Sequence, residues 1–292
     1  MTGYLYPGSI EEALGCLEHY GGSAQVIAGG TDLMPDLRLG KRNPACLVDI
    51  TRIPGLDRIE LLGDTVQVGA AVTFAALRDS PIIQQRVPAL AEAARSVGAA
   101  PIQAVATWAG NIVQAMPAAD GAIVALALEA EARLMDTSGS CWQPVESLFA
   151  GPGRSAVDST RQLITHLRFR LPPGAWGAAW NRVGRRESLV LPILNCAARL
   201  CLHPDGARIA GASLALGPVA PRPHRARRAE AVLVGQPAEA EIFEHAARIV
   251  QEESNPRSSA VRASRDYRLS IIPPLVAATL ADAARRARAL IQ

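Results

Sequence analysis

Two glycine-containing loops in the first half of the chain constrain its fold and chemistry more than any other feature. The first reads AQVIAGGTDL, residues 24 to 33, and the second reads TWAGNIVQAMPAAD, residues 107 to 120. In each loop an apolar approach of β type meets glycine and then small hydroxyl, amide or acid side chains. Gly29, Gly30 and Gly110 can take backbone angles closed to other residues and leave N–H groups uncovered. The pattern predicts backbone that binds a polyanion, with pyrophosphate as its natural ligand.

Size and charge set broad limits on the function. A chain of 292 residues with 49% hydrophobic content is long enough for two or three domains with their own cores. The 30 basic and 27 acidic side chains leave a net charge of +3, too small to indicate nucleic acid as a partner. The amino terminus lacks a signal-peptide pattern, and the longest apolar stretch is far shorter than a membrane span. We therefore expect a cytoplasmic protein with no membrane span.

Cysteine and histidine give no sign of a metal centre or a catalytic triad. The five cysteines are scattered, with no C-x-x-C pair and no histidine placed to complete a metal site. The five histidines are equally dispersed, and no Ser/His/Asp or Cys/His grouping stands out. We expect no metal and no catalytic side chain in this chain, which suits a protein whose reactive atoms belong to a cofactor.

Local periodicity and turn residues predict mixed helices and strands before residue 172. Ser9 and Glu12 form a capping box at the start of the first helix, and Gly63-Asp64 turns a hairpin. Asp120 is expected to cap a later helix. The expected helices are 9–20, 74–79, 88–97 and 121–128. The expected strands are 25–28, 46–50, 59–61, 66–70, 131–135 and 163–171.

The cluster Pro172-Pro173-Gly174 is the clearest domain boundary in the sequence. After it come two strand-like runs, 190–202 and 208–216, and then three helical stretches, 225–234, 238–251 and 260–288. Strands followed by helices predict an α+β carboxy-terminal domain.

Several other motifs also have plainer structural explanations. The first loop lacks the G-x-G-x-x-G spacing of a nicotinamide-binding turn. The segment 151–156, GPGRSA, fits that spacing loosely, but the polar residues after it favour an ordinary surface loop. The basic run 222–228 has no interleaved aromatics and favours a solvated helix start. In the second loop, Asn111 and Asp120 offer an amide and a carboxylate suited to ribityl and ribose hydroxyls.

Taken together, these segments resemble the FAD-binding medium subunit of the molybdenum hydroxylases, the family of bacterial xanthine dehydrogenases and carbon monoxide dehydrogenases. AGGTDL at 28–33 is similar to the family's first flavin loop, and T-x-x-G-N with P-x-x-D, within 107–120, is similar to its second. Further similar segments are LVDI at 47–50, VGAAVT at 68–73, ALGPVAPRPHRARRAE at 215–230 and residues 264–269. The resemblance covers nearly the whole chain.

The resemblance implies a fold and a set of cofactor contacts. The fold is α+β: a two-part FAD-binding domain of the vanillyl-alcohol-oxidase (PCMH) type over 1–173, with parts of about 1–55 and 56–173, followed by a small α+β domain over 174–292. The implied FAD contacts are Val26, Ile27, Ala28, Gly29, Gly30, Thr31, Asp32, Thr107, Trp108, Ala109, Gly110, Asn111, Asp120 and Leu163.

The resemblance also implies partners. Similar proteins work with a subunit that holds two [2Fe-2S] clusters and with a large subunit that binds molybdopterin. Substrate is hydroxylated at molybdenum, and electrons pass through the clusters to FAD and on to an acceptor such as NAD. Two other functions stay open at the level of sequence: a stand-alone FAD-dependent oxidase or dehydrogenase, and a flavin-free scaffold subunit.

The sequence departs from the family pattern at three positions. Ala109 stands where the family usually has the first glycine of T-x-G-G-N, which places a Cβ in the second loop. Met116 replaces a small polar residue before Pro117, and Asn181 stands where lysine is frequent. The first two bear on the affinity for FAD, and the third bears on the choice of electron acceptor.

Overall fold

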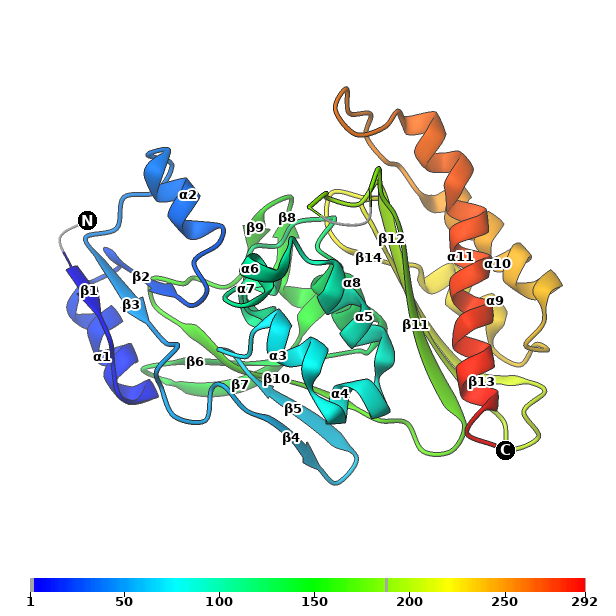
Figure 1. The fold of residues 1–292 in the computed structure, drawn as a ribbon, viewed down its shortest axis with the longest axis horizontal. Helices are drawn as coiled ribbons and strands as arrows, with labels where there is room; N and C mark the ends of the chain where they lie inside the picture. Colours follow the sequence, from blue (N-terminus) through cyan, green and yellow to red (C-terminus); the bar gives the residue numbers. More distant parts are fainter. Residues whose placement is uncertain (1–2, 187–188, 292) are drawn as a thin grey trace.

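Three β-sheets follow one another along the molecule in the computed structural model, which describes residues 3–186 and 189–291 (Figure 1). Helices α3, α4, α5 and α8 lie between the second sheet and the third, and α9, α10 and α11 cover the far face of the third. The α+β architecture expected from the sequence, with a carboxy-terminal α+β domain, is confirmed.

The first sheet is parallel, with strand order β1-β3-β2. Its elements are β1 (Gly3–Leu5), α1 (Ile10–His19), β2 (Ala24–Ile27), α2 (Leu33–Arg38) and β3 (Cys46–Asp49). Ser9 caps α1, because its hydroxyl accepts from the Glu12 N–H at 3.1 Å, while the Glu12 carboxylate accepts from the Gly8 N–H at 2.6 Å. The first glycine loop thus begins where a buried parallel strand ends.

The second sheet is antiparallel, with strand order β4-β5-β10-β6-β7. Its strands are β4 (Ile59–Leu62), β5 (Thr65–Gly69), β6 (Glu131–Asp136), β7 (Gly139–Pro144) and β10 (Leu163–Arg170). Leu167 and Phe169 of β10 point into the core while Arg168 and Arg170 point outward, as the period of two requires. A small hairpin of β8 (Phe149–Gly151) and β9 (Arg154–Ser155) follows the 3₁₀ turn η1 (Val145–Leu148).

The helices packed on this sheet form the main core. They are α3 (Phe74–Asp79), α4 (Pro81–Arg86), α5 (Pro88–Ser96), α6 (Ala100–Gln103), α7 (Trp108–Val113) and α8 (Asp120–Ala127). Every residue of α8 is buried, and the helix contacts the third sheet as well as α5 and α7. A helix that is apolar on all sides belongs in the interior, so α8 is the central element between the two domains.

The third sheet is antiparallel, with strand order β11-β12-β13-β14. Its elements are β11 (Trp176–Val183), β12 (Leu194–Leu202), β13 (Ile209–Gly217), β14 (His224–Arg225), α9 (Arg227–Leu233), α10 (Ala240–Glu253) and α11 (Arg265–Arg288). This sheet and its three helices enclose a second apolar cluster.

The local predictions differ from the structure at a few elements. Strand β11 was not expected, because its small residues directly after the Pro/Gly cluster show no alternation; its first half is buried throughout. Helix α4 was also missed. Asp120 does not cap α8: the cap is Ala119, without a side-chain bond. Helix α11 begins at Arg265 because the Ser264 hydroxyl accepts from the Tyr267 N–H at 3.2 Å.

Candidate functional site

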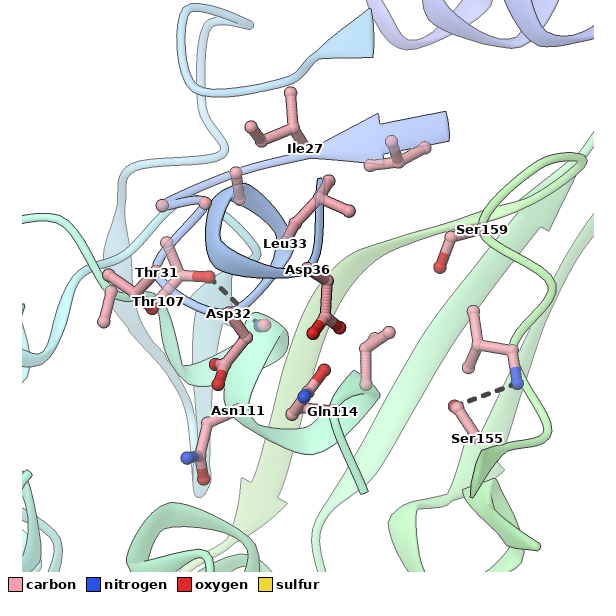
Figure 2. Close-up of a pocket in the computed structure, with 18 of the residues that line it drawn as sticks. Ile27, Thr31, Asp32, Leu33, Asp36, Thr107, Asn111, Gln114, Ser155 and Ser159 are labelled. Atoms are coloured by element: carbon pink, nitrogen blue, oxygen red, sulfur yellow. Dashed lines mark hydrogen bonds between the residues drawn. The ribbon is translucent and has the colours of Figure 1, made fainter. Parts of the chain in front are cut away.

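Both glycine loops line one cavity of about 610 Å³. Figure 2 shows Thr31, Asp32, Thr107 and Asn111 gathered on one side of it, with Ser155 and Ser159 opposite. The sequence-predicted site residues found in its lining are Val26, Ile27, Ala28, Gly29, Gly30, Thr31, Asp32, Thr107, Gly110 and Asn111. Segments distant in the sequence therefore meet at a single site.

Close backbone packing at Gly29 brings the two loops together. A Cβ at this position would lie 2.0 Å from the Val105 carbonyl oxygen and 2.8 Å from the Ala106 Cα atom. Only glycine fits such an approach, whatever its backbone angles. Gly30 has a φ of 66°, the left-handed region that glycine takes without strain. The first loop thus lies directly on the chain that leads into the second.

The first loop presents free backbone donors. Within residues 3–186 and 189–291, the N–H groups of Gly29, Gly30, Thr31 and Asp32 donate to no protein acceptor. Backbone N–H groups without an internal partner, close together in a turn, are the usual means of binding an oxyanion. The loop therefore has the donor set that a pyrophosphate requires.

The second loop is fixed by its own cap. The Thr107 hydroxyl accepts from the Gly110 N–H at 3.0 Å, and the Asn111 N–H donates to the Thr107 carbonyl at 3.0 Å. The Asn111 Oδ1 atom is buried, and none of the residues that the structure describes gives it a hydrogen-bond partner. A buried polar atom without a partner is costly unless a ligand supplies the bond. Asn111 is thus suited to accept from a ligand donor.

Apolar side chains cover another part of the lining. Phe74, Val97 and Ile102 come from the amino-terminal domain, and Leu191 comes from the connection between β11 and β12 of the carboxy-terminal domain. Such a wall suits a flat ring system. No sequence pattern singles out these four residues, because each is an ordinary apolar residue outside any motif.

Three carboxylates also face the cavity. Burial, and then the charge of Asp36, raises the pKa of Asp32. Asp36 forms ion pairs with Lys41 at 3.4 Å and Arg42 at 3.8 Å. A hydrogen bond from the Thr160 hydroxyl lowers the pKa of Asp158. The lining therefore has three carboxylates beside two arginines, Arg42 and Arg154, although its loops have the form of an anion-binding site.

The remaining predicted site residues lie outside the lining. Trp108 is 0% exposed, and its indole N–H donates to the Gly121 carbonyl at 2.9 Å. Ala109 and Leu163 are buried as well. These side chains belong to the core behind the cavity. The Cβ of Ala109, a departure from the family pattern, therefore takes up none of the cavity.

Asp120 has partners from both domains, at the contact between them that we call the seam. Its Oδ1 accepts from the Asn195 amide at 2.5 Å, its Oδ2 accepts from the Ser96 hydroxyl at 3.2 Å, and Arg182 lies 3.7 Å away. Burial raises its pKa to about 6, against the opposing effects of these three groups. Asp120 is not in the cavity lining, and Asn195 of β12 already binds its carboxylate. Its contact with a ribityl or ribose hydroxyl stays a prediction.

The rest of the P-x-x-D segment also contacts the carboxy-terminal sheet. The Asn195 amide also donates to the Ala118 carbonyl at 3.2 Å, and a Cβ on Gly217 would lie 2.0 Å from the Pro117 carbonyl oxygen. The second motif is therefore divided. Residues 107–111 face the cavity, and residues 117–120 hold the carboxy-terminal sheet.

The interpretation of residues 151–156 as an ordinary surface loop is wrong. Gly153, Arg154 and Ser155 line the cavity, together with residues 157–160. The Val26 N–H donates to the Ser159 carbonyl at 2.9 Å, which joins this segment to the strand before the first loop. The segment forms a third wall of the cavity. The loose glycine spacing was the only sign of this in the sequence.

The basic run 222–228 is not simply a solvated helix start either. The Arg225 side chain is largely buried and donates to Glu230 and to Glu129, each at 2.7 Å. Glu129 also binds Arg199, so two arginines of the carboxy-terminal domain share one carboxylate of the amino-terminal domain. Paired charges of this kind join the domains rather than forming a free phosphate site.

Two family models match consecutive parts of the chain. Residues 1–172 match the model described as the FAD binding domain in molybdopterin dehydrogenase. The chain belongs to this molybdopterin dehydrogenase FAD-binding family. Residues 179–283 match the carbon monoxide dehydrogenase flavoprotein C-terminal domain. As a family member, the chain is an oxidoreductase subunit with FAD as its cofactor, and the recognition made from its motifs is confirmed.

Relatives of this FAD-binding family extend over nearly the whole chain. The xanthine dehydrogenase FAD-binding subunit of Escherichia coli O157:H7 is 30% identical over 273 residues, 92% of this chain and 91% of that protein. The 6-hydroxypseudooxynicotine dehydrogenase complex subunit alpha of Paenarthrobacter nicotinovorans is 31% identical over 292 residues, 98% of this chain and 95% of that protein. A carbon monoxide dehydrogenase structure from Hydrogenophaga pseudoflava superposes with a TM-score of 0.90 at 29% identity, covering 97% of both chains.

Among the helices that the structure describes, none is long and apolar enough to cross a membrane. Over the same part of the chain, no group of three or more His, Cys, Asp or Glu side chains is placed to hold a metal ion.

Proposed function

We propose that the cavity binds FAD and that this chain is the electron-transfer subunit of a molybdenum hydroxylase complex. The observation that carries the proposal is the convergence, in one cavity, of the free N–H groups of residues 29–32 with Thr107, Gly110 and Asn111. Bound flavin would supply the redox chemistry, accepting electrons one at a time and releasing them as a pair.

The residues present fit the cofactor in three respects. The N–H groups of the first loop suit a pyrophosphate, and the unpartnered Asn111 Oδ1 suits a hydroxyl or imide donor. The apolar side chains of Phe74, Val97, Ile102 and Leu191 suit the flavin ring. The protein contribution is binding, orientation and exclusion of water, so the chain needs no acid or base of its own.

The proposal also includes the partner subunits and the electron acceptor. We infer that the chain works with an iron–sulfur subunit and a molybdopterin-binding large subunit, and that FAD passes electrons to an acceptor such as NAD. One relative is named as a subunit of a dehydrogenase complex. The superposed structure is of a carbon monoxide dehydrogenase that lacks the Mo-pyranopterin moiety of the molybdenum cofactor. These names support the proposal, and the cytoplasmic location stays a prediction.

We also propose the domain limits 1–173 and 174–292, with the first domain divided near residue 55. Two features support these limits. The family matches end at residue 172 and resume at residue 179. The parallel sheet lies within residues 3–49, and the five-stranded sheet lies within 59–170.

The test is a flavin titration of the purified chain, followed by copurification from its native host. We expect saturable quenching of FAD fluorescence, a flavin absorbance band and a higher melting temperature with FAD. A chain that stays colourless and shows no stabilisation by FAD would support a flavin-free scaffold. Turnover of a small substrate by the isolated flavoprotein would instead support a stand-alone oxidase. Associated chains with molybdenum and iron would support the complex.

A further inference from the structure

The charges around the cavity leave an anionic cofactor short of a counter-ion. The lining contains the carboxylates of Asp32, Asp36 and Asp158, and the guanidinium groups of Arg42 and Arg154. A pyrophosphate adds about two further negative charges, and like charges at close range repel strongly where water is partly excluded. The free N–H groups of the first loop supply partial charges only. A full positive charge near the phosphates would balance the site.

Among the described residues of the lining, Arg154 is the cation without a carboxylate partner. Arg42 lies 3.8 Å from Asp36, and Asp158 faces Arg161, outside the lining, at 3.8 Å. Across the described residues, no carboxylate oxygen lies within 4.0 Å of an Arg154 nitrogen. Its side chain is exposed and long enough to move toward a ligand.

The hairpin that carries Arg154 is held in place from both sides. Gly153, with a φ of 63°, forms the turn, and its N–H donates at 3.1 Å to the carbonyl of Ala115, just after α7. The Ser155 hydroxyl accepts from the Val157 N–H at 3.1 Å, and the Ser159 carbonyl accepts from the N–H of Val26 in β2. The backbone of Arg154 is therefore fixed relative to both glycine loops, while its side chain remains free.

We propose that Arg154 is the counter-cation for the pyrophosphate of the bound flavin dinucleotide. The inference rests on the proposed FAD binding and adds a residue to it. A guanidinium presents several N–H donors in one plane, a geometry that matches phosphate oxygens. Arg154 then offsets the acidic lining and makes the affinity for FAD depend on salt.

The experiment compares FAD affinity in four forms of the full chain: wild type, R154Q, R154K and the control R133Q. Arg133 is a matched control because it lies on the second sheet, outside the cavity lining, and its guanidinium donates to the Ser140 hydroxyl. Each Gln variant removes one positive charge, so an effect shared by both comes from the general field alone. Dissociation constants are measured by FAD fluorescence at low and high NaCl, and melting temperatures of the FAD-free forms report folding.

We expect R154Q to weaken FAD binding by roughly 10- to 100-fold, the usual effect of removing a charge-assisted hydrogen bond to phosphate. R154K should keep most of the affinity, R133Q should bind as wild type does, and R154Q should lose much of the salt dependence. Equal affinity of R154Q and wild type, or an unchanged salt dependence, overturns the role of Arg154. Failure of the wild type to bind FAD is a different result and overturns the proposed function itself.

Discussion

Replacing Gly29 by alanine tests whether contact between the two loops builds the site. The added Cβ would lie 2.0 Å from the Val105 carbonyl oxygen, a separation that real Cβ atoms essentially never show, with 3.0 Å as the practical limit. The neighbouring atoms are backbone, so no side chain can rotate away. One loop must move by about 1 Å, and overpacking of this kind costs about 1 to 3 kcal/mol. For a protein of this size we expect a melting temperature lower by roughly 3 to 10 °C.

Cofactor binding should suffer more than stability in this variant. A shift of about 1 Å takes the N–H groups of residues 29–32 out of register with the second loop, and losing one or two charge-assisted bonds weakens FAD binding by at least about tenfold. Differential scanning fluorimetry measures the first effect, and FAD fluorescence titration measures the second.

Gly15 provides the matched control for this experiment. It lies in α1, and a Cβ there would have no atom within 4 Å. Because alanine is the better helix former by roughly 0.5 to 1 kcal/mol, G15A should be neutral or slightly stabilising and should bind FAD normally. If G29A melts like wild type and binds FAD with equal affinity, the close approach of the two loops is not what builds the site.

Three other predictions address the cap, the seam and the counter-ion. Thr107→Ala should lower the free energy of unfolding by about 0.5 to 2 kcal/mol and weaken FAD binding, while Thr107→Ser keeps the cap; urea unfolding of both variants measures the difference. The folded chain keeps the Asp120 proton to about pH 6, whereas the unfolded chain loses it near pH 4, so stability due to this group falls as the pH rises through that window. Melting curves from pH 4 to 7 should therefore show Asp120→Asn gaining on wild type by about 1 to 3 kcal/mol, and parallel curves would contradict the burial argument. For Arg154→Gln, the weaker and less salt-dependent FAD binding described above is the expected result.

The division of the second motif changes how its conservative replacements should be interpreted. Thr107 and Asn111 act at the cavity, but Asp120 acts through β12 of the other domain. If changing Asp120 lowers the affinity for FAD, the cause would therefore be a shift between the two domains. Changing Asn195 or Arg182, which contact the same carboxylate, should then have the same effect.

Much of the fold follows from local patterns in the sequence. The Ser9 cap, the Gly63-Asp64 turn and the strand expected over 163–171 depend on residues a few positions apart, and each is found where expected. Strand β11 was missed because its first half is buried throughout, so it carries no alternation of apolar and polar residues.

The sequence by itself determined the positions of the two glycine loops. Each loop can be recognised from residues that are neighbours in the chain. Only the tertiary structure decided which side chains share the cavity. It placed the hairpin of Arg154 against both loops and turned Asp120 toward Asn195. The physical reason is that such neighbours are set by the packing of α8 and two sheets whose strands are distant in the chain, and contacts of that kind leave no local pattern in the sequence.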